Sequence, residues 1–461
     1  MAMKSLARFA GRKVGILGMA RSGLAAGRVL AAAGADVLAW DDQPGPLAEA
    51  ARFGARAGTA ADIPSLAALV ASPGVPLTHP APHPVIAAAQ AAGVEVTCDI
   101  ELFADGLGPR PLLAITGTNG KSTTSALAHH LLRAAGRDAV LGGNIGKAVF
   151  ELDPGPEDRI VVLELSSFQL DLCARLHPRV ACWLNLTPDH LDRHGDLDGY
   201  IAAKRRIFRN QGAGDTAVIG VDDAPSAAVL AGLARPRTVA VSVERRLAAG
   251  VYVEQGRLYD ATGSAPVAVA DLTGLPTLRG AHNHQNVAVA YGAVRALGLA
   301  AEEAVAGLAS FAGLAHRMEE VARAGRVVWI NDSKATNPDS ATKSLGCFDN
   351  LFWIAGGKPK PGGFRSLRPY LGAVREAYAI GQAADALAAD LGDLVPVHRS
   401  GTLDAALSAA SDAAEASGLE PAVVLLAPAC ASFDQFRSFE HRGDVFRSLA
   451  RARAGDARTA A

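Results

Sequence analysis

The fold class of this chain is indicated by a glycine-rich segment, Thr116-Gly117-Thr118-Asn119-Gly120-Lys121-Ser122-Thr123-Thr124. The apolar run 112–115 precedes it, and a helical pattern over 125–135 follows it. Strand, glycine-rich loop and helix in this order form a phosphate-binding loop. Its glycines let backbone N–H groups turn onto phosphate oxygens, Lys121 supplies a positive charge, and the Ser122 hydroxyl can bind Mg²⁺. The stretch therefore predicts a nucleoside triphosphate site on an α/β sheet.

The loop departs from the general motif at one position. A glycine is expected five residues before Gly120, but Ile115 stands there. The loop is therefore the shortened form Gly-x-x-Gly-Lys-Ser. Taken alone, it leaves a kinase, an ATPase and a ligase open.

Length and composition narrow the class of protein. The 461 residues predict about three domains, at ~150 residues each. Hydrophobic residues make up 49% of the chain but aromatic residues only 5%, so Ala, Leu and Val must build cores of helices on sheets. A net charge of −1 excludes attachment to nucleic acid or to an anionic membrane by bulk charge.

The distribution of cysteines and of apolar segments indicates the cellular compartment of the protein. Cys98, Cys173, Cys182, Cys347 and Cys430 are scattered and form no Cys-x-x-Cys pair, which argues against a disulfide framework or a zinc site. The start of the chain is basic but lacks the apolar core of a signal peptide. Since no apolar stretch approaches the ~20 residues of a membrane span, we expect a soluble cytoplasmic protein.

Strand-like runs alternate with helical patterns along almost the whole chain, which predicts parallel sheets covered by helices. The expected strands are 14–17, 37–40, 112–115, 160–165, 180–186, 327–330, 351–355, 377–380 and 423–427. The expected helices include 24–33, 200–209 and 281–297. Residues 238–269 alternate between apolar and polar side chains instead and suggest a small antiparallel patch. We expect the Ala/Arg-rich tail after Arg451 to be frayed.

Two breaks divide this pattern. The breaker cluster 106–111 lies just before the phosphate loop, and a fresh strand–helix series begins after 311–314. We therefore predict three domains, 1–105, 106–312 and 313–461. The fold class is α/β, with a Rossmann-like first domain, a central phosphate-loop domain and a Rossmann-like third domain.

The first domain opens with a near match to the dinucleotide-binding fingerprint. It reads Gly18-x-Ala20-x-x-Gly23, with alanine at the second glycine position. Asp41 and Asp42 end the next strand, where an acidic residue would meet a ribose. The match favours contact with some nucleotide or diphosphate over NAD binding. The alternative is a close strand-to-helix turn that simply needs glycine.

Two strand ends in the central domain carry further polar side chains. Glu164 closes the strand after the phosphate loop, where it could hold the Mg²⁺ of a triphosphate. The segment 185–195 also follows a strand and contains two His and two Asp within six residues, which favours a metal or phosphate contact. From periodicity alone, Lys204 is a solvated lysine on the helix 200–209.

Together these motifs resemble the Mur ligase family, the ATP-dependent amide ligases of peptidoglycan precursor synthesis. The shortened phosphate loop is the form found in that family. The matching segments run in the family's order and spacing across nearly the whole chain, and they are 117–123, 164–169, 189–193, 202–204, 280–286, 313–317, 331–337, 427–436 and 439–443.

Within the family, the chain resembles the members that add D-glutamate. Asp99-Ile-Glu-Leu-Phe103, Asn331-Asp-Ser-Lys-Ala-Thr-Asn337 and Ala427-Pro-Ala-Cys-Ala-Ser432 carry this likeness. The Asp-Asn-Pro-Arg motif of the diaminopimelate-adding relatives does not occur. The resemblance implies that ATP phosphorylates the carboxylate of UDP-N-acetylmuramoyl-L-alanine, and that the amine of D-glutamate then attacks the acyl phosphate.

The resemblance also implies roles for individual residues. ATP would be held by Gly117, Thr118, Asn119, Gly120, Lys121, Ser122, Thr123, Asn283, Asn286, Arg317 and Asp332. Two Mg²⁺ ions would be held by Ser122 and Glu164 and by His190 and Lys204, with Lys204 carbamylated. Lys121, Lys204, His190 and Asn144 would be catalytic. D-Glutamate would be held by Lys334, Thr336, Lys360, Ser432 and Phe439. The UDP-linked substrate would contact Ala20, Arg21, Ser22, Asp42, Ser72, Pro73 and Gly74.

The sequence leaves two of these assignments open. Lys358 competes with Lys360 in the segment 356–363. In the first domain, Asp42-Gln43 stands where some relatives have Thr-Arg, which leaves the uracil and diphosphate contacts open.

The resemblance leaves two other classes of function to be weighed. One is a sibling Mur ligase or a folylpolyglutamate synthase, which shares the ATP domain but takes another amino acid. The other is a nucleotide-sensing protein without catalysis, which would have no need of the second metal site that Glu164, His190 and Lys204 predict. For the ligase we expect a monomer whose domains close around the ligands, with hinge motion near 104–111 and 311–315.

Overall fold

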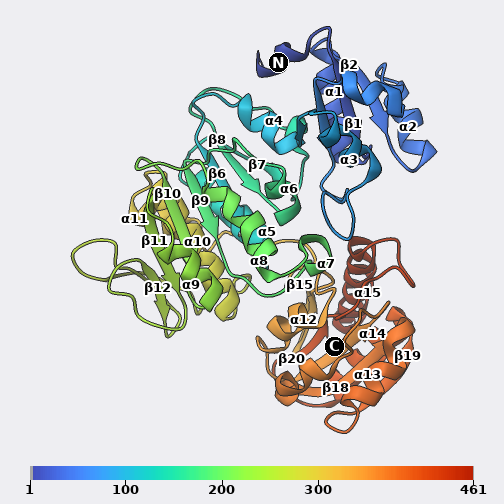
Figure 1. Cartoon of the computed structure of the whole chain (residues 1–461). Coiled ribbons are helices and arrows are strands. Elements are labelled where there is room, and N and C mark those ends of the chain that lie inside the picture. The colour runs from blue at the N-terminus through green and yellow to red at the C-terminus, as the bar shows by residue number, and fades with distance from the viewer. Residues whose placement is uncertain (1–3, 460–461) are drawn as a thin grey trace. The chain divides into compact units, whose positions relative to one another are not determined.

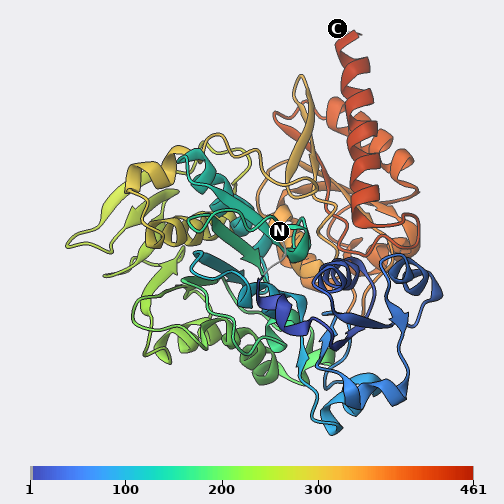
Figure 2. The same ribbon diagram turned by 90° about the horizontal axis from the view of Figure 1, so that it is seen from above.

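The computed structural model describes residues 4–459 and contains three β-sheets, shown from two directions in Figures 1 and 2. The chain forms two compact units. Unit 1 comprises the residues up to Thr273 together with Asn283–Ser310, and unit 2 comprises Gly274–His282 together with the residues from Phe311 onward. The passage between units after Ser310 lies close to the second predicted domain boundary. The division into three domains remains a prediction.

A five-stranded parallel sheet opens unit 1, in the order β3-β2-β1-β4-β5. Its strands are β1 (Lys13–Leu17), β2 (Asp36–Trp40), β3 (Arg56–Ala57), β4 (Ala68–Ala71) and β5 (Val96–Thr97). Helices α1 (Arg21–Ala32), α2 (Pro44–Ala51), α3 (Pro84–Ala91) and α4 (Asp99–Asp105) accompany them. The strand order reverses direction beside β1, and ligands of such sheets bind outside the carboxyl ends of the strands at that point.

A nine-stranded sheet forms the rest of unit 1, in the order β14-β13-β12-β11-β10-β9-β6-β8-β7. Its strands are β6 (Leu112–Thr116), β7 (Ala139–Gly143), β8 (Ile160–Glu164), β9 (Val180–Trp183), β10 (Thr216–Gly220), β11 (Arg237–Ser242), β12 (Val251–Glu254), β13 (Arg257–Asp260) and β14 (Val267–Asp271). Its helices are α5 (Lys121–Ala134), α6 (Ser167–Asp171), α7 (Leu191–His194), α8 (Leu197–Arg205), α9 (Ala224–Ala231), α10 (Ala281–Ala296) and α11 (Ala301–Ala306).

Helices cover both faces of this sheet. Ile219 of β10 shares a core cluster with Ile207 and Phe208, which follow α8. The neighbouring Val218 instead lies against Gly292 of α10. Because successive side chains of a strand point to opposite faces, α10 and the segment after α8 lie on opposite sides of the sheet. The central parallel strands β6, β8, β9 and β10 are therefore almost entirely buried, as their apolar runs predicted.

Unit 2 contains a six-stranded sheet, in the order β15-β16-β20-β17-β18-β19. Its strands are β15 (Glu319–Ala324), β16 (Val327–Asn331), β17 (Leu351–Gly356), β18 (Val374–Ile380), β19 (Val397–Gly401) and β20 (Ala422–Leu426). Its helices are α12 (Pro338–Leu345), α13 (Ala384–Leu391), α14 (Leu403–Ala416) and α15 (Phe439–Thr459). Val328 and Trp329 of β16 belong to two different core clusters, so this sheet also buries both faces.

The described residues also form short 3-10 helices. They are η1 (Lys4–Phe9), η2 (Ala60–Ser65), η3 (Val149–Glu151), η4 (Arg206–Phe208), η5 (Arg365–Ala373) and η6 (Gly381–Ala383). No helix within residues 4–459 is both long enough and apolar enough to cross a membrane.

The α/β class and the predominantly parallel sheets confirm the sequence prediction, with two corrections. The antiparallel patch covers β12, β13 and β14, but β11 pairs in parallel with both of its neighbours. The β10–β11 pair is parallel because α9 carries the chain back between these two strands, and such a crossover produces parallel strands. The tail after Arg451 is helical up to Thr459, because α15 continues through it as one helix (Figure 2).

Candidate active site

The phosphate loop follows β6 and has the backbone that its glycines predicted. Gly117 and Gly120 have φ angles of 153° and 86°, values that residues other than glycine rarely adopt. A Cβ atom at Gly117 would lie 2.8 Å from the Cβ of Leu184, and one at Gly120 would collide with Asn286. The glycines therefore allow this loop to lie between the end of β9 and the start of α10.

Neighbouring segments fix the loop from outside. The Asn119 N–H donates to Asn185 Oδ1 at 2.9 Å, and the Thr118 N–H donates to the Asn185 carbonyl at 3.0 Å. The Lys121 ammonium group donates to the carbonyls of Gly117 and Thr118 at 3.0 and 2.8 Å. Ser122 and Thr123 follow in the first turn of α5, whose N-terminus adds partial positive charge. The loop is thus a preformed cradle for anionic oxygens.

Asn283 and Asn286 lie beside the loop, as the resemblance implied. Both are buried near the start of α10. Asn286 Oδ1 accepts a hydrogen bond from Thr124 Oγ1 at 3.1 Å, and its Nδ2 donates to Asn283 Oδ1 at 3.0 Å. The structure therefore brings these two amides to the phosphate loop.

Glu164 ends β8, the strand next to β6, and is only 1% exposed. Its Oε1 accepts a hydrogen bond from Asn144 Nδ2 at 2.7 Å. Its Oε2 is buried and has no hydrogen-bond partner within the described part of the chain. Since a buried carboxylate oxygen needs a partner, this atom fits a ligand of a cation. Asn144 is correspondingly the side chain that orients the carboxylate.

Lys204 is buried, not solvated as its helical periodicity alone suggested. It lies on α8, is 1% exposed, and donates from Nζ to the Gly117 carbonyl at 2.8 Å and to Thr116 Oγ1 at 3.4 Å. Its Nζ lies 4.7 Å from the centre of the Tyr200 ring. Burial, and then the nearby charge of Lys121, lower the pKa of Lys204 well below its ordinary value. Periodicity failed here because α8 turns this side chain under the phosphate loop.

His190 caps the N-terminus of α7 in a left-handed conformation with φ of 54°. Its ring lies 4.8 Å from the Phe168 ring and 6.3 Å from the Tyr200 ring, measured between centroids. Burial lowers its pKa, which favours the neutral imidazole that binds metals. A left-handed backbone at a residue other than glycine is a strain that recurs at functional sites.

These residues fit a Mg²⁺ site. Glu164 offers its Oε2, which has no hydrogen-bond partner among the described residues. Ser122 offers a hydroxyl group in the first turn of α5, directly after the phosphate loop. Within residues 4–459, no group of three or more His, Cys, Asp and Glu side chains lies together in an arrangement that could hold a metal ion. The predicted ligand set is not such a group, because it contains only one carboxylate, Glu164, and one imidazole, His190. Only carbamylation would make Lys204 an anionic ligand.

The predicted contacts of the UDP-linked substrate meet at the carboxyl ends of β1, β2 and β4. Ser72 Oγ donates to the Gly18 carbonyl at 2.6 Å, which joins the Ser72-Pro73-Gly74 segment to the turn that leads into Ala20, Arg21 and Ser22. Asp42 is exposed, whereas Asp41 accepts from the N–H groups of Met19 and Gln43 at 2.6 and 2.8 Å. Asp41 is therefore the acidic residue that shapes this edge, and the predicted contact of Asp42 with the substrate stays a prediction.

In unit 2, Asp332 and Lys334 follow β16. The buried Asp332 accepts from Ser344 Oγ, and burial raises its pKa to about 6. Lys334 Nζ lies 3.9 Å from the centre of the Phe439 ring. The structure thus brings Lys334 and Phe439, two predicted D-glutamate contacts, into direct contact.

Arg442 lies beneath these residues and was missed as a site residue by sequence reasoning. It is fully buried, with 0% exposure. Its guanidinium group donates to Ser333 Oγ at 3.0 Å, to the Ser333 carbonyl at 2.9 Å and to the Cys430 carbonyl at 3.2 Å. One cation therefore holds the Lys334 segment against the Ser432 segment. Its place in the Phe-Glu-His-Arg-Gly motif was the available signal.

The remaining D-glutamate candidates are placed less tightly. Ser432 is buried, and Thr336 is half-buried after Lys334. The side chains of Lys358 and Lys360 are both exposed, but the Lys358 backbone pairs with Ala431, the neighbour of Ser432, at 2.9 and 3.1 Å. The choice between the two lysines stays a prediction.

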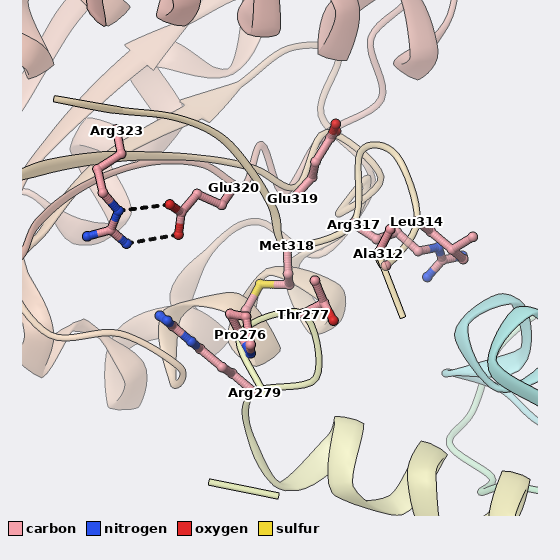
Figure 3. Close-up of a pocket in the computed structure, with 11 residues that line it drawn as sticks. Pro276, Thr277, Arg279, Ala312, Leu314, Arg317, Met318, Glu319, Glu320 and Arg323 are labelled. Atoms are coloured by element: carbon pink, nitrogen blue, oxygen red, sulfur yellow. Dashed lines mark hydrogen bonds and ion pairs between the residues drawn. The ribbon is translucent and has the colours of Figure 1, made fainter. Parts of the chain in front are cut away.

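A pocket of about 380 Å³ opens beside Arg317 within unit 2 (Figure 3). The Arg323 guanidinium and the Glu320 carboxylate face each other at its wall across two hydrogen bonds of 2.9 Å. The lining residues are Pro276, Thr277, Arg279, Ala312, Gly313, Leu314, Arg317, Met318, Glu319, Glu320 and Arg323. Its volume is within the range of small-ligand sites, and Arg317 is a predicted ATP contact.

Comparison with known proteins agrees with this geometry. The chain matches the Mur ligase middle domain over residues 115–294 and the Mur ligase glutamate ligase domain over residues 316–430. It is 50% identical to UDP-N-acetylmuramoylalanine–D-glutamate ligase of Caulobacter sp. (strain K31), over 95% of this chain and 96% of that protein. It is also 50% identical to the ligase of the same name from Nitrobacter hamburgensis, over 97% and 98% of the two chains.

Solved structures show the same fold at low sequence identity. MurF from Acinetobacter baumannii superposes with a TM-score of 0.63 at 16% identity, over 97% of this chain and 98% of that one. The UDP-N-acetylmuramate–alanine ligase MurC from Thermotoga maritima gives a TM-score of 0.57 at 18% identity, over 96% and 99%. From the matched domains and the identity to these relatives, the chain belongs to the Mur ligase family of ATP-dependent, amide-forming ligases.

Proposed function

We propose that this chain ligates D-glutamate to UDP-N-acetylmuramoyl-L-alanine in the cytoplasm, as a monomer, at the expense of ATP. One observation carries the reaction type: the buried amine of Lys204 lies against the phosphate loop and within the electrostatic influence of Glu164, whose Oε2 has no hydrogen-bond partner among residues 4–459. The choice of D-glutamate is supported by relatives that bear that activity in their names, at 50% identity over 95% of the chain.

The physical problem of the reaction is charge, because a carboxylate must approach an anionic triphosphate. The backbone N–H groups of Gly117–Gly120, Lys121 and the start of α5 form a positive cradle for the β- and γ-phosphates. Mg²⁺ held by Ser122 and Glu164 would neutralise further phosphate charge. Asn144 holds the Glu164 carboxylate in place through a hydrogen bond of 2.7 Å. The carboxylate oxygen then attacks the γ-phosphorus, ADP leaves, and an acyl phosphate forms.

Lys204 is proposed to act as a carbamate. Its position explains why: Nζ is enclosed by the Gly117 carbonyl, Thr116 Oγ1 and the Tyr200 ring. The unprotonated amine is the form that reacts with CO₂, and enclosure away from water favours that form. The product is an anion at the place where His190 supplies a neutral imidazole, so the pair could hold a second Mg²⁺.

The second step is attack by the D-glutamate amine on the acyl carbon, with departure of phosphate. The two carboxylates of D-glutamate need cationic and hydroxyl partners, which Lys334, Thr336, Ser432 and a lysine of the 358–360 segment would supply. Asp332, Arg317, Asn283 and Asn286 would hold the nucleoside and phosphates of ATP.

Amino-acid-dependent phosphate release tests the proposal. The purified chain is incubated with ATP, Mg²⁺ and UDP-N-acetylmuramoyl-L-alanine, and each amino acid is added in turn. D-Glutamate is expected to stimulate phosphate release and to yield the ligated nucleotide by mass spectrometry. Turnover with L-glutamate or L-lysine but not with D-glutamate would identify a sibling ligase or a folylpolyglutamate synthase instead. Binding of ATP with no turnover under any condition would identify a nucleotide sensor.

A further inference from the structure

Arg193 lies between two parts of the site that were assigned separately. It belongs to the one-turn helix α7, whose N-cap is His190. Its guanidinium group reaches the segment after β4, donating to the carbonyls of Gly74 at 2.7 Å and Val75 at 2.8 Å, with Pro73 at 3.5 Å. All these residues belong to unit 1. A single side chain of the nine-stranded part thus holds three consecutive carbonyls of the five-stranded part.

The segment that Arg193 holds is a turn with internal support. The Val75 N–H donates to the Ser72 carbonyl at 3.0 Å and closes the turn from inside. Ser72 Oγ donates to the Gly18 carbonyl at 2.6 Å and joins the turn to the start of α1. Because the C=O and N–H of a peptide point to opposite sides, a cation that fixes the carbonyls also fixes the direction of the N–H groups. Arg193 therefore sets how this turn can present N–H donors to an anion.

The other face of Arg193 contacts the catalytic side. Its guanidinium carbon lies 4.6 Å from the centre of the Phe168 ring, and Phe168 lies 4.8 Å from the His190 ring. Guanidinium groups stack on aromatic faces in this way. The ring of Phe168 therefore packs against both the side chain that holds the Ser72–Val75 turn and a predicted metal ligand.

A second contact fixes α7 against the same segment. Gly195 ends α7 with φ of 84°, and a Cβ atom there would lie 2.9 Å from His79 Nε2. The segment after β4 thus meets α7 at Arg193 and again at Gly195. Arg193 is half-buried, and burial lowers its pKa.

We propose that Arg193 is a positioning residue for the nucleotide-linked substrate. It holds the Ser72–Val75 turn, which contains the predicted contacts Ser72, Pro73 and Gly74 of that substrate, in register with α7 and His190. A long substrate with one end on each sheet needs this register, because an error of about 1 Å at the reacting atoms can cost about 100-fold in rate. The inference rests on the proposed function, which supplies the nucleotide-linked substrate, while the contact of that substrate with Ser72, Pro73 and Gly74 comes from the family resemblance.

Arg193→Ala tests the proposal through individual Michaelis constants. The KM for UDP-N-acetylmuramoyl-L-alanine is expected to rise about 10-fold or more, since charge-assisted hydrogen bonds to the turn are lost. The KM values for ATP and D-glutamate are expected to stay within about twofold, because neither ligand depends on the turn. Arg193→Lys keeps the charge but not the fork of donors, so an intermediate KM is expected.

Two further variants separate positioning from general damage. Arg52→Ala removes an exposed arginine from the same unit and should leave all three KM values unchanged. Phe168→Leu leaves the carbonyl contacts of Arg193 but removes the ring beside His190. The factor by which kcat falls should therefore exceed the factor by which the KM for the nucleotide substrate rises. Thermal unfolding of each variant shows whether it is folded.

The result that would overturn the proposal is a folded Arg193→Ala variant whose KM for the nucleotide substrate is unchanged, or whose three KM values rise together. Failure of the proposed function has a different signature, since the unmodified chain would then not turn over D-glutamate at all. Titration of UDP-N-acetylmuramoyl-L-alanine into the protein without ATP gives an independent reading. Arg193→Ala should weaken this binding by the same factor as its KM.

Discussion

Two buried cations, one in each unit, are held in the same way but can do different chemistry. Lys204 donates to the Gly117 carbonyl and Thr116 Oγ1 beneath the phosphate loop. Arg442 donates to Ser333 and to the Cys430 carbonyl beneath the predicted D-glutamate contacts. Neither forms an ion pair with a carboxylate within residues 4–459. Both sites therefore place a basic side chain that lacks a direct ion pair under a loop that is proposed to bind anions.

The difference lies in whether the group can give up its charge. Burial lowers the pKa of Arg442 only to about 10, so the guanidinium stays charged at neutral pH. Burial and the charge of Lys121 lower the pKa of Lys204 well below its ordinary value, which makes the neutral amine accessible. A guanidinium group keeps a fixed charge and holds structure, whereas an amine can be converted into an anion. The comparison assigns reactivity to the first site and fixed positioning to the second.

The largest expected effect is the loss of Lys204. Lys204→Ala should lower kcat by about 1,000-fold, the scale on which enzymes lose an electrostatic group that acts in the transition state. ATP binding should persist, because the loop N–H groups and Lys121 remain. Short carboxylates such as acetate should restore part of the turnover, since they can occupy the place of the carbamate. Phosphate release and nucleotide titration measure these three outcomes.

Lys204→Arg provides the matched test of reactivity. It keeps a positive charge in the same place but cannot take up CO₂, so it should be as inactive as the alanine variant. An active arginine variant, or unchanged turnover in Lys204→Ala, would contradict the carbamate.

The second effect is on Arg442. Arg442→Met keeps the apolar volume but leaves the buried carbonyls of Ser333 and Cys430 unpaired, which should cost about 3–5 kcal/mol of folding stability. The KM for D-glutamate should rise by about 10-fold to 100-fold as the Lys334 and Ser432 segments separate, while the KM for the UDP-linked substrate stays near normal. Added carboxylates should not rescue this variant. A rescue would mean that the two cations act alike.

The same contrast shows what sequence can and cannot reveal. The strands 112–115 and 160–165 and the glycine loop were predictable, because apolar runs and glycine spacing are local properties. Helical periodicity predicted a solvated Lys204, because the sequence of a helix does not show which distant part of the chain will cover it. Motif spacing recovered its site, since the whole set of separated segments resembled one family. Arg442 belongs to the Phe-Glu-His-Arg-Gly motif, yet its role depends on the Ser333 carbonyl, 109 positions away, and on the Cys430 carbonyl, 12 positions away.

A smaller effect concerns Asp99, a buried charge of the opposite sign that belongs to neither site. It is fully buried at the start of α4, and burial raises its pKa from 3.8 to about 6. The ionised form therefore costs stability above pH 6, and the cost disappears as the pH falls toward 3.8. Asp99→Asn should stabilise unit 1 at pH 8 by roughly 2–3 kcal/mol and have no effect near pH 4. Thermal unfolding at both pH values measures this, and a pH-independent difference would show that Asp99 does not titrate in this way.

The smallest expected effect concerns Lys334, and it distinguishes the role of Lys334 from that of the buried Arg442. Lys334 Nζ lies 3.9 Å from the centre of the Phe439 ring, and such contacts are worth about 0.5–2 kcal/mol. Phe439→Leu should therefore raise the KM for D-glutamate by about 2-fold to 30-fold, while Phe439→Tyr, which keeps an aromatic face, should stay near normal. Phe436→Leu is a matched control, because that ring lies against His441 and not against a lysine.

The order of the two effects in unit 2 is the sharper test. Ser333 Oγ donates to the Phe439 carbonyl, and this backbone contact survives in Phe439→Leu, so the ring variant should disturb Lys334 without loosening the segment. Arg442→Met should loosen the segment itself and should change the KM for D-glutamate more. If removing the ring instead costs as much as removing Arg442, then Lys334 is held by Phe439, and the buried guanidinium serves folding alone.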